Sequence, residues 1–220
     1  MEKLTRENYL AAPTTASSLP FWKEEAFKLP ENMLVIGEAE FERALDSNKN
    51  AFVNYSDEPY FKLVFRMAGN RIEKPELPRG YALYNGTSKE FSEHIRLCYG
   101  GGPDETEIEN YKKHPTHDPS LFIMLKDEKT GSIVASGIAE ADSRIGEGVL
   151  EWIQVSQGAR RKGLGRFIVS ELLWRMRDKA DFVTVSGMLK SESNPLALYK
   201  RCGFGGMAVW HILTKARKGE

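Results

Sequence analysis

The sequence predicts a mixed α/β fold, because apolar runs typical of strands alternate with long helical patterns through its second half. One of these strands leads directly into a basic, glycine-containing loop and then into a helix. The composition, 41% hydrophobic and 28% charged, is ordinary for a soluble globular protein. A chain of 220 residues buries roughly 70% of its unfolded surface, so it can form a core without disulfides.

The first 75 residues carry the weaker signals. We interpret residues 1–75 as an N-terminal extension and residues 76–220 as the main domain. Residues 68–80 are rich in proline, glycine and charge, which is typical of a connector, and the boundary is placed there. The elements expected before it are a strand at 33–36, a helix at about 38–46 and a strand at 60–67.

Two helices are expected after a strand at 81–85. The first, residues 88–100, has apolar side chains at helical spacing. The second, residues 106–113, begins with Thr106 as N-cap, and Glu109 three residues later fits a capping box.

Strands and helices alternate through the rest of the chain. Residues 120–142 are expected to form a β-hairpin, since two apolar runs flank a charged turn that ends in Gly131. Pro195 just inside its start and Gly203 just past its end predict a short helix at 194–203. The other elements expected are a strand at 147–156, a helix at 163–180, a buried strand rich in β-branched residues at 181–187 and a last strand at 207–215.

Charge and cysteine content exclude several functions. The 31 basic and 31 acidic residues balance, which argues against a nucleic-acid or membrane partner. Cys98 and Cys202 lie far apart and the four histidines show no ligand spacing, so no metal site is expected. His114 and His117 are expected in a surface loop, with a substrate-gating loop as the alternative. Because the N-terminus lacks a signal-peptide pattern and no run reaches 18 apolar residues, we expect a cytoplasmic protein.

The loop that opens the helix at 163–180 has the character of an anion site. Arg160, Arg161 and Lys162 add positive charge where the first N–H groups of a helix lack intrahelical partners. Glycine at 163 and 165 allows a ligand to approach the backbone. The alternative is an ordinary turn with three solvated basic side chains. The spacing fits neither a P-loop nor a dinucleotide fingerprint.

This loop resembles the acetyl-CoA loop of the GNAT N-acetyltransferase superfamily. Residues 160–165 fit the family pattern Gln/Arg-x-x-Gly-x-Gly/Ala after a strand and at the start of a helix. Residues 155–165 also follow a longer family pattern. In that pattern Gln157 replaces the usual proline and Arg161 replaces the first glycine.

A second motif follows about thirty residues later. The segment NPLALYKRCGF, residues 194–204, resembles the fourth-helix motif of the family, with Tyr199, Gly203 and Phe204 at matching positions. The resemblance covers residues 81 to about 215. It implies a mostly antiparallel central sheet flanked by helices, and it leaves the N-terminal extension unexplained.

The resemblance implies acetyl-CoA as cosubstrate and no metal. In GNAT enzymes the pantetheine arm lies between two splayed strands, here residues 149–155 and 182–186, and loop N–H groups bind the pyrophosphate. The family asparagine lies seven residues before the tyrosine, whereas Asn194 lies only five before it and also suits a helix N-cap. The cofactor-binding residues so implied are Ile153, Val155, Arg160, Arg161, Lys162, Gly163, Leu164, Gly165, Arg166 and, more weakly, Asn194.

The implied reaction is direct attack of a neutral amine on the thioester in a ternary complex. Tyr199 resembles the tyrosine that protonates the departing CoA thiolate, a role that suits a phenol with a pKa of about 10. Its alternative role is that of a packing aromatic. In some members of the family a glutamate on this strand is the base, and the position that matches it here is Val149. Glu151 is the candidate in its place, because strand alternation puts it on one face with Val149, Ile153 and Val155. The alternatives are a structural ion pair for Glu151 and a water chain as the base.

We therefore expect an N-acetyltransferase that acts on a primary amine of a small molecule or a peptide. The alternative is a non-catalytic acyl-CoA-binding or regulatory module on the same fold. Residues 88–117 and the extension would shape the acceptor site. Residues 1–75 would cover the acceptor, form a homodimer contact or complete the sheet.

Overall fold

Eight strands form a mixed, mostly antiparallel sheet flanked by helices in the computed structural model, which describes residues 4–26, 28–191 and 193–215. The strands are β1 (Met33–Gly37), β2 (Tyr55–Arg66), β3 (Tyr81–Tyr84), β4 (Phe122–Asp127), β5 (Ile133–Asp142), β6 (Glu147–Val155), β7 (Phe182–Met188) and β8 (Gly205–Lys215). Their order is β1-β8-β2-β7-β6-β5-β4-β3. The predicted fold class is confirmed. The chain falls into two units, residues 1–65 with 184–220 and residues 66–183, and each is described by itself.

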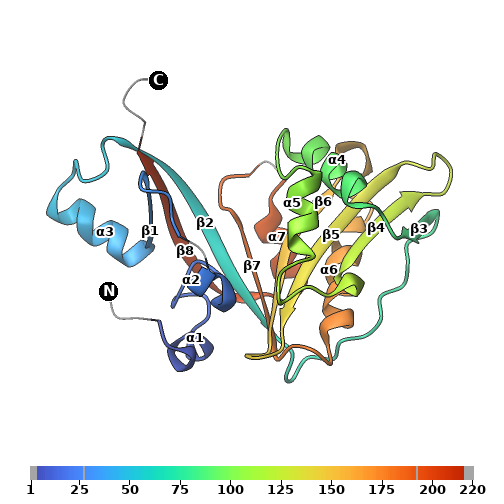
Figure 1. Ribbon diagram of the computed structural model, residues 1–220, viewed down its shortest axis with the longest axis horizontal. Coiled ribbons are helices and arrows are strands. Elements are labelled where there is room, and N and C mark those ends of the chain that lie inside the picture. The colour runs from blue at the N-terminus through green and yellow to red at the C-terminus, as the bar shows by residue number, and fades with distance from the viewer. Residues whose placement is uncertain (1–3, 27, 192, 216–220) are drawn as a thin grey trace. The chain divides into compact units, whose positions relative to one another are not determined.

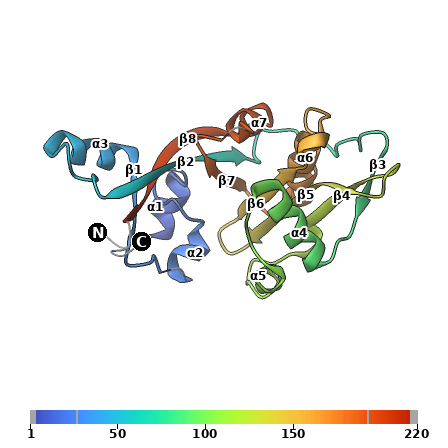
Figure 2. The same cartoon turned by 90° about the horizontal axis from the view of Figure 1, so that it is seen from above.

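In the unit of residues 66–183, helices cover both faces of strands β4 to β6 (Figures 1 and 2). Helices α4 (Ser88–Tyr99) and α5 (Glu105–Tyr111) lie on one face, and α6 (Leu164–Met176) lies on the other. α6 lies close to the sheet because β5 and β6 present glycines to it. A Cβ atom added at Gly137 would lie 2.5 Å from Ile168, and one at Gly148 would lie 2.6 Å from Met176.

The core on the α4–α5 face is apolar. Full burial of a large apolar side chain, such as Phe, Ile or Met, stabilises a fold by roughly 1.5–3 kcal/mol. The residues that form it are Phe91 and Ile95 of α4, Ile108 of α5, Phe122 and Met124 of β4 and Ile138 of β5. Tyr111 and Trp152 pack against this cluster from its edge.

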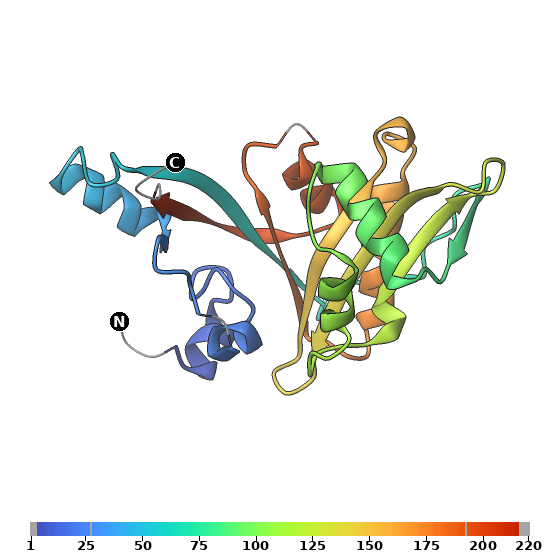
Figure 3. The ribbon, with the colours of Figure 1, turned by 45° about the horizontal axis from the view of Figure 1, so that its top comes forward.

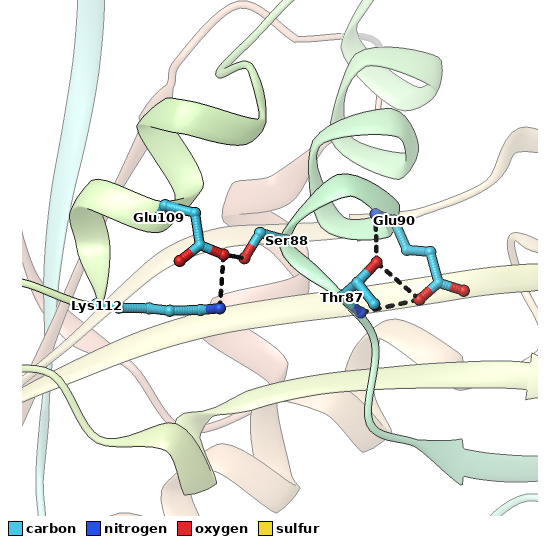
Figure 4. Close-up of polar contacts among 5 residues, drawn as sticks. All are labelled: Thr87, Ser88, Glu90, Glu109 and Lys112. Atoms are coloured by element: carbon cyan, nitrogen blue, oxygen red, sulfur yellow. Dashed lines mark hydrogen bonds and ion pairs between the residues drawn. The ribbon is translucent and has the colours of Figure 1, made fainter.

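Polar side chains fix the start of α4 and join it to α5 (Figure 4). The Thr87 hydroxyl accepts the Glu90 N–H at 3.2 Å, and the Glu90 carboxylate accepts the Thr87 N–H at 2.8 Å, which completes a capping box. The Glu109 carboxylate accepts hydrogen bonds from the Ser88 hydroxyl and, at 2.7 Å, from the Lys112 ammonium. Glu109 therefore links the two helices.

α5 begins at Glu105, one residue earlier than predicted. Its N-cap is Asp104, whose carboxylate accepts the Glu107 N–H, while the Glu107 carboxylate accepts the Asp104 N–H, both at 2.8 Å. The prediction of Thr106 as N-cap is therefore wrong. The reciprocal pair two residues earlier provides acceptors for the N–H groups of Asp104 and Glu107.

In the other unit, β8 pairs antiparallel with both β1 and β2 (Figure 3). The N-terminal segment thus contributes strands to the sheet, which is one of the three roles that the sequence leaves open. Helix α3 (Glu38–Ser47) contacts β1 and β8, and helix α7 (Pro195–Arg201) begins at the predicted proline. The six-residue helices α1 (Arg6–Ala11) and α2 (Phe21–Ala26) were not predicted. They are too short to show a helical period.

A buried lysine ties the N-terminal segment to β2. Lys62 is 1% exposed. Its ammonium donates to the carbonyls of Ser17 at 2.9 Å and Leu19 at 2.8 Å, and to the Tyr9 hydroxyl at 3.2 Å. These bonds hold the residues between α1 and α2 against the strand.

Candidate functional site

The loop between β6 and α6 contains two residues with left-handed backbone. After a single 3-10 turn at Gln157–Ala159, Arg161 has φ 63° and Gly163, the N-cap of α6, has φ 80°. The left-handed conformation costs a residue with a side chain roughly 1–2 kcal/mol. This cost explains why the longer pattern described above has a glycine where this chain has Arg161. The Arg160 side chain donates from Nε to the Val155 carbonyl at 3.3 Å. Arg160 thereby holds the loop against the end of β6.

The start of α6 is suited to an anion. Helices α4 and α5 have side-chain caps and acidic residues in their first turns, whereas α6 has no acidic residue there and its N-cap, Gly163, has no side chain. The exposed basic residues around it are Arg160, Arg161, Lys162 and Arg166. Leu164, 1% exposed, anchors the loop in the core. The N–H groups and dipole of this helix end favour a negatively charged ligand.

A β-bulge interrupts β6 in front of this loop. Ile153 pairs with Gly137 of β5, but the next pair joins Leu150 to Ala139, so β6 uses three residues where β5 uses two. The extra residue lies at Glu151–Trp152. Bulges bend a strand and redirect side chains, and they are frequent beside active sites.

The bulge changes which side chains of β6 share a face. Ile153 faces α6, since a Cβ at Gly137 would contact it together with Ile168. Glu151 instead lies near Tyr111 of α5, where its charge raises the tyrosine pKa. The expectation that Glu151 shares a face with Ile153 and Val155 is therefore wrong, because strict alternation does not hold across a bulge.

Aromatic side chains surround the bulge. The Tyr99 hydroxyl donates to the Ile153 carbonyl at 3.1 Å, and its ring meets the Trp152 ring edge-on at 5.8 Å between centroids. Trp152 donates from Nε1 to the Tyr111 hydroxyl at 3.0 Å. Burial, followed by the nearby charge of Glu151, raises the pKa of Tyr111 well above its ordinary value. Tyr111 therefore stays neutral at physiological pH.

Next to Tyr111 lies a carboxylate–histidine pair that sequence reasoning missed. Glu140 of β5 has a side chain only 1% exposed, and its Oε1 accepts a hydrogen bond from His114 Nδ1 at 2.6 Å. The Thr116 hydroxyl donates to the same oxygen at 3.1 Å. His114 is thus bound to the sheet, although its segment was expected to be a surface loop. The available signal was Glu140, an acidic residue within an otherwise apolar strand that ends in a second one, Asp142.

A histidine that is buried lies at the start of the loop. His94 of α4, 3% exposed, bonds through Nδ1 to the Ser136 hydroxyl at 2.7 Å and through Nε2 to the Ser156 hydroxyl at 2.9 Å. The Gln154 amide also donates to the Ser136 hydroxyl. Burial lowers the pKa of His94 from 6.5 to about 4. The imidazole is therefore neutral at physiological pH and fixes Ser156, the residue where the loop begins.

Tyr199 and Asn194 belong to the other unit. The Tyr199 ring, 5% exposed, packs against Phe61 at 6.1 Å and Phe204 at 5.7 Å between centroids. The Asn194 side chain accepts the Ala197 N–H at 3.2 Å, so it caps α7 as the sequence also suggested. Its φ of 47° is one that asparagine tolerates better than most residues.

Among residues 4–26, 28–191 and 193–215, no group of three or more His, Cys, Asp or Glu side chains could hold a metal ion. The helices in these ranges are all too short or too polar to cross a bilayer.

Comparison with known proteins shows the family to which the chain belongs. A family model described as the Acetyltransferase (GNAT) family matches residues 83–204, more than half of the chain. Both predicted motifs, the loop after β6 and the segment around α7, fall inside this match. A comparison with curated proteins gives no match.

Solved structures share the fold at low sequence identity. A GCN5-related N-acetyltransferase from Sphaerobacter thermophilus is 16% identical with a TM-score of 0.67, over 86% of this chain and 60% of its own. A Drosophila protein is 16% identical with a TM-score of 0.60, over 89% of this chain and 65% of its own. A GNAT-family protein from Novosphingobium aromaticivorans is 12% identical with a TM-score of 0.54, over 87% and 71%. The chain thus spans less than two thirds of the first two structures.

Proposed function

Because the chain belongs to the GNAT acetyltransferase family, we propose that it transfers an acetyl group from acetyl-CoA to a primary amine by direct attack in a ternary complex. The start of α6 carries this proposal. Its first turn lacks an acidic residue, its cap is Gly163, and four exposed basic side chains lie around it. These features suit the pyrophosphate of CoA.

The cofactor would bind mainly through the main chain. Backbone groups of Ile153 and Val155 would bond the pantetheine arm, and those of residues 161–165, with the Arg166 side chain, the pyrophosphate. Arg160 and Lys162 would add charge, with Arg160 also holding the loop through its bond to the Val155 carbonyl. Asn194 is the weakest candidate, since its side chain already caps α7.

Tyr199 would donate a proton to the departing CoA thiolate. A phenol with a pKa of about 10 matches a thiol with a pKa of about 8.5 closely enough for general acid catalysis. Glu151, at the bulge of β6, would receive the acceptor amine and favour loss of its proton, directly or through water. No metal is required for this reaction.

A non-catalytic acyl-CoA-binding or regulatory module is the alternative, and turnover with an amine separates the two. Several further expectations stay predictions: the division into an extension at 1–75 and a transferase domain at 76–220, a cytoplasmic location, and a homodimer.

Thermal melting with acetyl-CoA, CoA and ATP tests the cofactor. A ligand at a hundred times its Kd adds about 2.7 kcal/mol to the unfolding free energy, which is a readily measured shift. We expect a shift with acetyl-CoA and CoA but not with ATP, followed by thiol release in the presence of primary amines. Absence of any shift would contradict the proposal, and a shift without turnover would favour the non-catalytic module.

A further inference from the structure

A buried carboxylate orients a partly exposed histidine beside the bulge of β6. The Glu140 side chain is 1% exposed, and a carboxylate at such depth is costly unless hydrogen bonds compensate it. His114 Nδ1 at 2.6 Å and the Thr116 hydroxyl at 3.1 Å supply such bonds. The His114 side chain itself is 28% exposed. A carboxylate bound to one ring nitrogen fixes the tautomer and the direction of the other, which is how histidine bases are oriented in hydrolases.

One tyrosine joins this pair to the bulge. The rings of Tyr111 and His114 lie 5.0 Å apart between centroids, and the Tyr111 hydroxyl accepts a bond from Trp152, a bulge residue, at 3.0 Å. The charges that raise the pKa of Tyr111, after burial, belong first to Glu151 and then to Glu140. Both carboxylates therefore lie close to the same phenol ring. The region combines carboxylates with the aromatic rings of Tyr111 and Trp152, and both kinds of group attract an alkylammonium ion.

We propose that His114, oriented by Glu140, is the base that deprotonates the acceptor amine, while Glu151 attracts its ammonium form to the bulge. The inference rests on the proposed function and refines it by separating the binding of the ammonium from the removal of its proton. The acceptor class that fits is a primary alkylamine, protonated in solution.

The ammonium R–NH3+ gives one proton to Nε2 of His114, and the Glu140 carboxylate stabilises the imidazolium that forms. The amine lone pair then forms the C–N bond with the thioester carbon, and the C–S bond breaks. CoA leaves as a thiolate and takes up one proton, and the nitrogen loses its second proton to give the amide. His114 returns its proton to solvent, so the net release is one proton per acetyl group transferred.

A matched set of variants tests the base. His114→Gln keeps an N–H donor toward Glu140 but cannot take a proton, and Glu140→Gln keeps the shape of the carboxylate without its charge. Glu151→Gln tests attraction of the ammonium. His117→Gln is the control, because it makes the same change three residues along the same segment, where the ring packs on Phe122. Melting temperature and acetyl-CoA affinity report whether each variant is folded.

Two acceptors separate a base from a structural residue. One is the best primary alkylamine from a panel of phenethylamine, lysine methyl ester and spermidine. The other is methoxyamine, which is unprotonated at pH 7.5 and has no ammonium proton to lose before attack. We expect His114→Gln to lower kcat for the alkylamine about 100-fold, the usual size of a general-base effect. With methoxyamine the loss is expected to be much smaller, and added imidazole should restore alkylamine turnover.

The other variants test the orienting carboxylate, the attraction of the ammonium and the control position. Glu140→Gln should lower kcat about 10-fold with the same dependence on acceptor. Glu151→Gln should raise KM for the alkylamine more than it lowers kcat, and His117→Gln should match the wild type. Should His114→Gln fail to fold, Glu140→Gln with the two acceptors gives the same discrimination.

Equal losses on both acceptors, or an alkylamine rate within threefold of wild type in both His114→Gln and Glu140→Gln, would overturn the assignment of the base. A wild-type protein that binds acetyl-CoA but acetylates neither acceptor would instead remove the proposed function, and this inference with it. An active wild type with an unaffected His114→Gln removes only the inference.

Discussion

Replacing His94 should remove a defined part of the pH dependence of stability. His94 is 3% exposed, and burial lowers its pKa from 6.5 to about 4. Between these values the unfolded chain binds a proton at this residue and the folded chain does not. Stability is therefore lost as the pH falls from about 6.5 towards 4, and it levels off below that.

The size of the effect follows from the two pKa values. Each pKa unit corresponds to 1.36 kcal/mol, so the complete effect of the shift approaches about 3.4 kcal/mol. Between pH 7 and pH 5 the linkage relation gives about 2 kcal/mol. Neighbouring Cys98, whose Sγ lies 3.6 Å from His94 Nε2, adds no charge in this range because burial raises its thiol pKa.

Urea unfolding of the wild type and of His94→Gln at pH 7, 6 and 5 measures this contribution. Glutamine does not titrate, and the carboxylates and the other three histidines are the same in both proteins. The difference between the two pH profiles thus isolates His94. We expect the wild type to lose about 2 kcal/mol more than the variant between pH 7 and pH 5. Parallel profiles would refute the reasoning, since they would mean that His94 titrates alike in the folded and unfolded chains.

Changes at three further positions test the cofactor loop, the acid and the N-terminal segment. Gly163→Glu should abolish acetyl-CoA binding in a melting titration. Gly163→Ala, whose Cβ meets nothing within 4 Å, should bind while losing roughly 1 kcal/mol or more of stability to backbone strain. Tyr199→Phe keeps the ring against Phe61 and Phe204 and should lower turnover about tenfold or more at unchanged acetyl-CoA affinity; an unchanged rate would remove the acid role. Lys62→Met leaves the carbonyls of Ser17 and Leu19 without their lysine donor and should cost about 2 kcal/mol or more in urea unfolding. A loss below about 0.5 kcal/mol would contradict that role.

The sequence predicted the elements whose signals are local. The strand, basic loop and helix from residue 147 to residue 176 were recognised because an apolar run, glycines and a helical pattern follow each other directly. The short helix at Pro195–Arg201 carries its own start and stop signals. The N-cap of α5 was misplaced because Asp104 and Thr106 both suit a cap, and each is followed three residues later by a glutamate. The structure shows that Asp104 and Glu107 exchange two hydrogen bonds, and the sequence alone does not distinguish this pair from Thr106 and Glu109.

The parts of the candidate site that were not predicted depend on contacts between distant segments. His114 and Glu140 lie 26 residues apart and meet only because the segment after α5 returns to β5. An acidic residue in a buried strand indicates that Glu140 has a polar partner, but it does not predict which residue that partner is. His94 likewise meets Ser136 and Ser156 from another element.

The face of Glu151 was misjudged for a related reason. Alternation of polar and apolar residues predicts which side chains share a face of a strand only when one face is polar. Strand β6 is instead covered by α4 on one side and by α6 on the other. An extra residue in such a strand leaves its apolar pattern unchanged while it shifts every following side chain to the opposite face. In β6 this shift separates, within five residues, the groups that we propose for the cofactor from those that we propose for the acceptor. Ile153 and Val155 keep their backbone beside the loop that suits a pyrophosphate, whereas Glu151 and Trp152 turn toward Tyr111 and the His114–Glu140 pair. A cofactor on one side of the bulge and a cationic amine on the other would meet where the strand departs from regular pairing.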